Sequence, residues 1–294
     1  MGAWAAIGAL MPSVGALDEG TPGDPGLYGP GSAVWRIARE RALLAGGGTA
    51  LFLQIAHPLV AAGVADHSGF REDPFARLRS TLDAMLRITF GDAAQSRQAA
   101  AQVAVVHRRV RGELAAGTGR FPAGSPYRAS DPDLAMWVHA TLVATALDAF
   151  ALLVRPLRAG EADAYYREAM RQAGLFGVSR SAMPADHAGF RVYVEEMVRS
   201  TLAVGPDARA IAPGILRPPV AFAARPALSA YGLLTAGLLP ERVRSLFGLP
   251  WDRARAAAFA GTAASVRAVV SILPERARFW PHAAVAERRV ARGR

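Results

Sequence analysis

Apolar residues recur at helical spacing along almost the whole chain, and this periodicity constrains the fold more than any other feature. Segments of roughly 10 to 25 residues keep the spacing. No run alternates strictly between apolar and polar residues, and none clusters β-branched residues between turn signals, so strands are not expected. We therefore predict an all-α fold, a single large domain of about ten helices around a buried pocket.

Capping residues and prolines divide the periodic segments into helices. Pro74, Asp131 with Pro132, and Asp186 stand where first turns begin. Glycines stand at three predicted helix ends: Gly91, Gly117 and Gly174. The predicted helices cover residues 33–45, 49–66 with an interruption at Pro58, 74–90, 95–116, 131–154, 160–173, 185–204, 222–237, 240–247, 251–272 and 281–292. Residues 117–129 and 205–219 are the predicted loops.

The length of 294 residues and an apolar content of 52% allow one large core. The segment from Asp18 to Ser32 is rich in glycine and proline, so we predict a flexible arm over residues 1–32 and a helical domain over residues 33–292. Met1 to Leu17 is apolar but lacks the basic region of a secretory signal, which predicts a cytoplasmic protein.

Residues 43–65 form an apolar stretch long enough to span a bilayer. The stretch contains a glycine triplet near its start and then Gln54, His57 and Pro58, whose polar groups would be costly in lipid. We therefore interpret it as a pair of buried core helices.

All 34 basic residues are arginine, and they give a formal net charge of +10. The arginines alternate with Asp, Glu and Ala along helical faces, so a nucleic-acid partner is not expected, while peripheral contact with a membrane stays open. The chain has no cysteine, which excludes disulfides, thiolate metal sites and iron–sulfur clusters. An iron or other metal would need His, carboxylate, Tyr or Met ligands.

Among the six histidines, His107 is the most informative. In the predicted helix 95–116 it shares an apolar stripe with Val103, Val110 and Leu114. A buried neutral imidazole can ligate iron, or it can be an ordinary core histidine held by a hydrogen bond. Arg111 borders the stripe and could reach an anionic group such as a haem propionate, or could simply be solvated.

Three further positions carry candidate chemistry. His139 lies in a segment so apolar that burial is nearly forced, so it needs a partner: a ligand, a propionate or a hydrogen bond. His57 precedes Pro58, which should kink the helix, and such a kink often lines a cavity. Arg77 and Thr81 share one helical face and could bind an anion or polarised dioxygen, or form a surface pair.

Several common catalytic motifs are absent from the sequence. There is no G-x-S-x-G elbow, no phosphate-binding P-loop and no H-E-x-x-H zinc motif. The carboxylate pairs lack the Glu-x-x-His spacing of di-iron bundles, so a di-iron oxygenase is a poor fit.

Between residues 33 and 290 the chain resembles the haem-dependent oxygenase family that includes the bacterial rubber oxygenase and the fungal mycophenolic-acid-pathway oxygenase. The strings that carry the resemblance, in order, are Leu53-Gln54-Ile55-Ala56-His57-Pro58 followed by Ala62-Gly63-Val64; Asp73-Pro74 with Arg77 and Thr81; Val106-His107-x-x-Val110-x-Gly112; Trp137-Val138-His139-Ala140-Thr141-Leu142; Tyr165-Tyr166; and Leu273-Pro274 with Pro281 and Arg288.

The resemblance implies an all-helical fold around haem b, with His107 as the proximal iron ligand and His139 as the second candidate. It also implies that Arg77 and Thr81 lie on the distal side and stabilise charge on bound dioxygen. In the rubber oxygenase a lysine stands beside that threonine, whereas this chain has Ser80 there and no lysine. The distal side must therefore differ.

Two function classes follow from the sequence. The first is a haem b-dependent oxygenase that uses dioxygen on an unsaturated, isoprenoid-like hydrophobic small molecule. The alternative is a non-catalytic helical protein that binds haem or a lipid between its helices.

Overall fold

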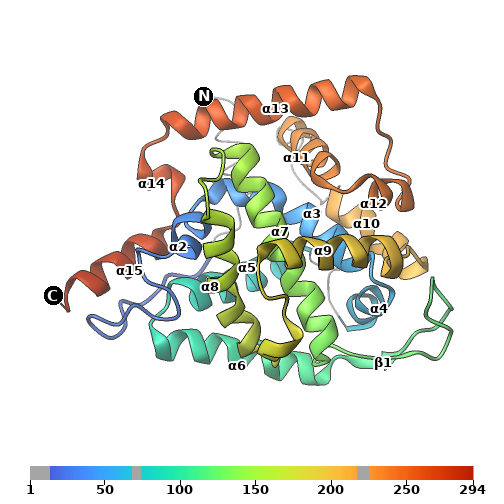
Figure 1. Cartoon of the computed structure of the whole chain (residues 1–294), viewed down its shortest axis with the longest axis horizontal. Helices are drawn as coiled ribbons and strands as arrows, with labels where there is room; N and C mark the ends of the chain where they lie inside the picture. Colours follow the sequence, from blue (N-terminus) through green and yellow to red (C-terminus); the bar gives the residue numbers. More distant parts are fainter. Residues whose placement is uncertain (1–13, 68–73, 217–224, 294) are drawn as a thin grey trace.

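The structure, a computed structural model, describes residues 14–67, 74–216 and 225–293, and the side chains of these residues except 74–77. Figure 1 shows a mainly helical body. In chain order the elements are α2 (Ala33–Ala38), η1 (Arg41–Gly46), α3 (Gly47–Ile55), α4 (Pro58–His67), α5 (Pro74–Phe90), α6 (Ala93–Arg109), β1 (Arg111–Glu113), β2 (Pro126–Arg128), α7 (Pro132–Leu153), α8 (Glu161–Leu175), η2 (Arg180–Ala182), α9 (His187–Glu196), η3 (Met197–Thr201), α10 (Pro206–Leu216), α11 (Arg225–Leu238), α12 (Glu241–Leu246), α13 (Arg253–Ile272), α14 (Glu275–Arg278) and α15 (Pro281–Ala291). The all-α prediction is confirmed.

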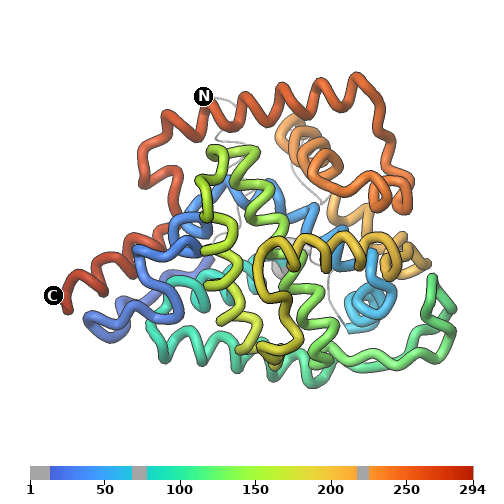
Figure 2. Tube along the Cα trace, in the orientation of Figure 1, coloured from blue at the N-terminus to red at the C-terminus, as the bar shows by residue number. Residues whose placement is uncertain are grey.

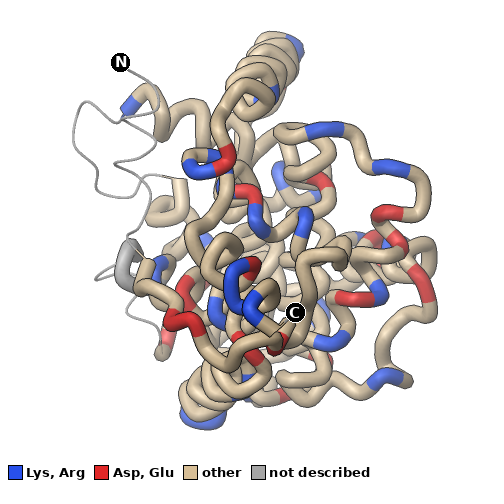
Figure 3. Tube along the Cα trace, turned by 90° about the vertical axis from the view of Figure 1, so that its left-hand side faces the viewer, with Lys and Arg blue, Asp and Glu red and all other residues tan. Residues whose placement is uncertain are grey.

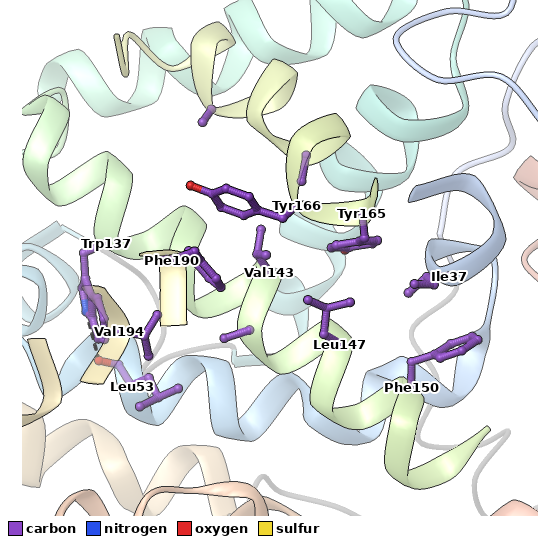
Figure 4. Packing of buried hydrophobic residues seen from close by; sticks show 14 of the residues in the cluster. Ile37, Leu53, Trp137, Val143, Leu147, Phe150, Tyr165, Tyr166, Phe190 and Val194 are labelled. Carbon is purple, nitrogen blue, oxygen red and sulfur yellow. Dashed lines mark hydrogen bonds between the residues drawn. The ribbon is translucent and has the colours of Figure 1, made fainter. Parts of the chain in front are cut away.

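Helix α7 runs through the middle of the fold and packs against α3, η1, α8 and α13 (Figures 1 and 2). Figure 4 shows Val143, Leu147 and Phe150 of α7 within the core, with Tyr165 and Tyr166 of α8 near them. Its N-terminus is fixed as predicted, because Asp131 caps the helix and Pro132 occupies the first turn. The apolar length of α7 therefore reflects its position at the centre of the core.

Two parts of the described chain pass a length and hydropathy test for membrane spans. Helix α7 passes alone, and 67% of its apolar window is buried in the fold. The helical pair Arg41–Ile55 and Pro58–His67 passes jointly but bends by 105° at its break. The break falls at Ala56 and His57, where Pro58 begins a new helix, so the predicted interruption at Pro58 is confirmed.

A short two-stranded sheet contradicts the expectation that the chain has no strands. Helix α6 ends at Arg109 rather than near residue 116, because Val110 is extended at φ −84° and ψ 99°. Arg111, Gly112 and Glu113 then pair in antiparallel register with Arg128, Tyr127 and Pro126. The predicted helix end at Gly117 and the uninterrupted loop 117–129 are both wrong for this reason.

Three other predicted boundaries differ from the structure. Residues 205–219, predicted as a loop, contain α10, which carries Pro213 inside it. Gly174 lies within the last turn of α8 rather than beyond its end. The predicted helix 185–204 begins under the expected Asp186 cap but continues as a π-helix, η3, before it ends.

Part of the N-terminal segment predicted as a flexible arm packs against the body. Leu17 and Tyr28 are buried in the main core. The Arg289 side chain of α15, only 1% exposed, donates from Nε to the Asp24 carbonyl at 2.8 Å and from Nη2 to the Phe90 carbonyl at 2.9 Å. This buried guanidinium joins the N-terminal segment, the end of α5 and the C-terminal helix.

Candidate functional site

His139 lies in α7 and is only 6% exposed, which confirms its predicted burial. Its Nε2 has no hydrogen-bond partner. Burial lowers the pKa of His139 to about 4, although a hydrogen bond to the Ala169 backbone of α8 partly opposes this shift. The ring is therefore neutral at physiological pH and has one buried ring nitrogen without a partner.

His107 lies in the last turn of α6 and is half-buried. The predicted apolar stripe is wrong beyond this residue, because Val110 and Leu114 leave the helix and pack with Ala62 and Tyr127 in a separate cluster. The ring of His107 lies 6.4 Å, centroid to centroid, from the ring of Phe176 at the end of α8. The imidazole thus lies at the margin of the core rather than inside it.

Both histidines face α8, and they do so along one side of it. His139 contacts the backbone of Ala169, and His107 contacts Phe176. Phe176, the residue that caps the C-terminus of α8, follows Ala169 by seven positions, about two helical turns, so the two residues lie on roughly one side of the helix. Gln172 between them is buried and donates from Nε2 to the Met85 sulfur of α5 at 3.3 Å. This side of α8 therefore meets α5, α6 and α7.

The sequence alone identifies Tyr165 and Tyr166 of α8 but not the residues on this side of the helix. Ala169, Gln172, Ala173 and Phe176 follow spacings of three and four residues. That pattern is the available signal for one helical face, but small and polar members weaken it.

His57 occupies a different environment from His139. It lies at the bend between α3 and α4, 4% exposed, with Nδ1 unpaired and its ring centroid 5.2 Å from that of Phe121. Burial, helped by the charge of Arg120, lowers its pKa to about 4.

The side of α7 that faces α3 is a different one. There Trp137 Nε1 donates to the Leu53 carbonyl at 3.2 Å, shown dashed in Figure 4. Thr141 Oγ1 accepts from Gln54 Nε2 at 3.0 Å. His57 and His139 thus have separate sets of neighbours.

The proposed distal residues lie on α5. The side chain of Arg77 is outside the described residues, and Thr81 is exposed. Helices α5 and α6 pack as a hairpin whose turn is at Gly91 and Asp92, where Asp92 and Gln95 form a capping box. Arg77 and His107 therefore belong to the ends of the two helices that lie away from this turn.

Arg111 is not one turn beyond His107 on a helix, as predicted, because it belongs to β1 and is exposed. It pairs across the sheet with Arg128. Its carbonyl accepts a hydrogen bond from His67 Nε2 at 3.0 Å.

The hairpin also explains the glycines of the matched strings. A Cβ on Gly112 would lie 2.5 Å from Tyr127 Oη, and a Cβ on Gly63 would lie 3.6 Å from the same ring. Tyr127 is buried and donates from Oη to Asp66 Oδ2 at 2.5 Å. Gly112 therefore leaves room for the aromatic ring that joins the hairpin to α4, whereas a Cβ on Gly63 would make only an ordinary contact with it.

Two of the hollows among the described residues have clear linings. One, of about 330 Å³, is lined by polar residues of α5, α6 and the N-terminal segment: Asp18, Asp83, Arg87, Gln95, Gln98, Ala99 and Gln102. The other lies on α12, beside Arg242. Neither of these two hollows is lined by a histidine.

Comparison with known proteins identifies the fold's relatives. Residues 34–268 match the family described as ER-bound oxygenase mpaB/B'/rubber oxygenase, catalytic domain. The matched region begins in α2 and ends within α13, so it includes every histidine discussed above.

Two curated relatives are similar over most of their length. They are uncharacterized proteins of Mycobacterium bovis and Mycobacterium tuberculosis, each 28% identical over 235 residues, which cover 77% of this chain and 88% of the relative. No solved structure matches the chain.

Proposed function

This chain belongs to the rubber oxygenase catalytic-domain family, and we propose that it is a haem b-dependent oxygenase acting on an unsaturated hydrophobic small molecule. Membership supports an oxygenase, and thus a substrate and dioxygen in general terms. The haem, its ligands and the isoprenoid-like class of substrate are the proposal.

One observation carries the haem proposal: a neutral imidazole in α7, His139, has a buried ring nitrogen with no partner. A buried polar atom without a hydrogen bond is costly and requires an explanation, and a bound ligand or a catalytic role is one such explanation. The donor type suits haem, since iron accepts imidazole and the chain has no cysteine.

His107 is the proximal ligand in this proposal, and His139 is the second candidate. His107 has the motif position that the resemblance assigns to the ligand, while His139 has the burial that a haem environment requires. Both contact the same side of α8, so the two readings place the group in one region of the fold. His57 has other neighbours and Arg111 is exposed in β1, so these two residues would contribute less directly to haem binding than His107 and His139.

Bound haem would supply an iron centre that activates dioxygen. The chain's own residues provide the surroundings. Burial of His139 keeps its ring unprotonated, so its nitrogen lone pair is available at neutral pH. Ala169, Ala173 and Phe176 present apolar surface toward this region and restrict water.

Arg77 and Thr81 would act from α5 on developing negative charge. Arginine keeps its charge under ordinary conditions and donates from a planar fork, while threonine offers one hydroxyl. Removing one well-aimed donor typically lowers the rate by about 10²–10³. Ser80 replaces the lysine of the rubber oxygenase, so no amine is available at that position.

The test compares Arg77→Ala with Arg79→Ala, a change at an exposed arginine on the same helix. Both variants are expected to keep the haem absorption band. We expect Arg77→Ala alone to consume dioxygen much more slowly with an unsaturated apolar substrate. Loss of haem from Arg77→Ala would instead indicate contact with a propionate. Unchanged haem retention and turnover would remove Arg77 from the site, and a wild-type protein that binds no haem would favour the lipid-binding alternative.

A further inference from the structure

The surface formed by the end of α6 and the β1–β2 hairpin carries arginines that have no acidic partner. Arg108, Arg109, Arg111 and Arg128 are all exposed. Nine ion pairs occur among the described residues, and none includes any of these four. We call these four residues, with Val105 and Val106, the arginine surface. No described carboxylate lies within ion-pair distance of these four arginines, although Glu113 of β1 is exposed in the same hairpin.

Two of the arginines oppose each other directly. Arg111 pairs with Arg128 in the antiparallel register. Hydrogen bonds from Ala129 N to the Val110 carbonyl and from Leu114 N to the Ser125 carbonyl, both 2.9 Å, mark the bonded positions of the ladder, and Arg111 lies at an alternate position. The pair is therefore of the non-hydrogen-bonded kind, in which the side chains are closest. Like charges in this position destabilise a sheet, and a bound anion would relieve the repulsion.

Apolar residues lie among these charges. Val105 is 41% exposed and Val106 is 58% exposed, although most large apolar side chains of the fold are covered. Arg108 and Arg109 follow Val105 by three and four residues, so all three lie on the outer face of α6. Figure 1 shows α6 and the hairpin along the same lower edge, with α4 and α7 above them.

The opposite end of the molecule is different. Figure 3 views the side that carries the C-terminus, where basic and acidic segments are intermixed. There Arg39 pairs with Glu287, and Arg278 pairs with Glu40. Unpaired arginines such as Arg253 also occur elsewhere, so the arginine surface is distinguished by its cross-strand arginine pair and its exposed valines.

We infer that the arginine surface docks on an anionic lipid bilayer. Exposed arginines around apolar side chains suit a surface that offers many phosphates above an apolar interior. Each arginine near such a membrane contributes roughly a fivefold gain in partitioning. The docked face includes the end of α6, so it would bring His107 near the membrane in which a hydrophobic substrate dissolves. That last consequence rests on the proposed function, whereas the binding itself does not.

Vesicle sedimentation of the full chain tests the inference without haem or turnover. The probes are phosphatidylcholine vesicles with and without phosphatidylglycerol. We expect binding only to the anionic vesicles, weakened about 25-fold in the double variant Arg109→Gln, Arg128→Gln by two such arginine contributions. The matched control, Arg253→Gln with Arg276→Gln, removes the same charge from exposed positions on α13 and α14. It should bind nearly as well as the wild type.

A second variant separates lipid insertion from charge alone. Val106→Ser should weaken binding when added salt screens the arginines, because only the apolar contribution then remains. Thermal unfolding checks that the variants fold, and Arg128→Gln should not lower Tm since it removes a like-charge pair. Equal binding by the double variant and its control would overturn the inference. So would retention of an immobilised acidic protein with no binding to anionic vesicles, which would identify a protein partner.

Discussion

The two histidines that face α8 have opposite surroundings. His139 lies in the middle of α7, enclosed by the core, whereas His107 lies in the last turn of α6, where the helix gives way to a two-stranded hairpin. The interior histidine is held neutral by its environment. The marginal one adjoins exposed valines and unpaired arginines. One side of the candidate site is therefore the packed core around α7, and the other is the more exposed end of α6 beside the hairpin.

The largest expected difference between the core and the edge is in packing. Trp137 is fully buried in α7 and bonded to Leu53, so Trp137→Ala should lower the free energy of unfolding by about 3–5 kcal/mol. Val106 at the end of α6 is 58% exposed, so Val106→Ala should change it by less than about 0.5 kcal/mol. Urea unfolding measures both, and similar losses would erase the distinction.

The next effect concerns protonation of the core histidine. Burial lowers the pKa of His139 from 6.5 to about 4, so the unfolded chain binds the proton more readily. Its contribution is complete above pH 6.5 and is lost as pH falls through that window toward 4, amounting to about 3 kcal/mol. Urea unfolding from pH 7 to pH 4 should show this loss, and His139→Gln should make the curve flatter. An equally steep curve for the variant would contradict the neutral buried ring.

At the β1–β2 hairpin, stability depends on the close approach of Gly112 to the Tyr127 ring. A Cβ on Gly112 would meet Tyr127 Oη, so Gly112→Ala should displace that ring and cost about 1–3 kcal/mol. Gly47 begins α3 with helical angles and open space around it, so Gly47→Ala should instead stabilise the chain by about 0.5–1 kcal/mol. Thermal unfolding of the two variants compares them. An increased Tm in Gly112→Ala would show that the Tyr127 ring moves aside without loss of stability.

The sequence predicts the core around α7 better than it predicts the edge formed by the end of α6 and the hairpin. In the core, helical periodicity and capping residues act locally, so the start of α7 at Asp131 and the burial of His139 were predictable. At the edge the outcome depends on contacts between distant residues. The pairing of Gly112 with Tyr127 ends the helix, and helical periodicity in the sequence cannot indicate a partner fifteen residues away.

The same reasoning applies to the candidate site. The sequence could single out His107, His139 and His57 one at a time, from the apolar residues around each. It could not show that the first two share a side of α8 or that His57 has other neighbours, because these relations depend on how α3, α7 and α8 pack. The roles of these residues and of Arg77, Thr81 and Arg111 stay predictions.

Haem titration followed by absorption tests the central claim most directly, that an imidazole facing α8 holds the cofactor. The wild type should bind one haem per chain with a Soret band. His107→Ala should lose it while circular dichroism stays helical, because truncation removes the iron bond but leaves space at only one position. His187→Ala, at the start of α9, should retain haem. Loss in His139→Ala, with retention in His107→Ala, would exchange the roles of these two histidines. A full Soret band in both His107→Ala and His139→Ala would contradict the account.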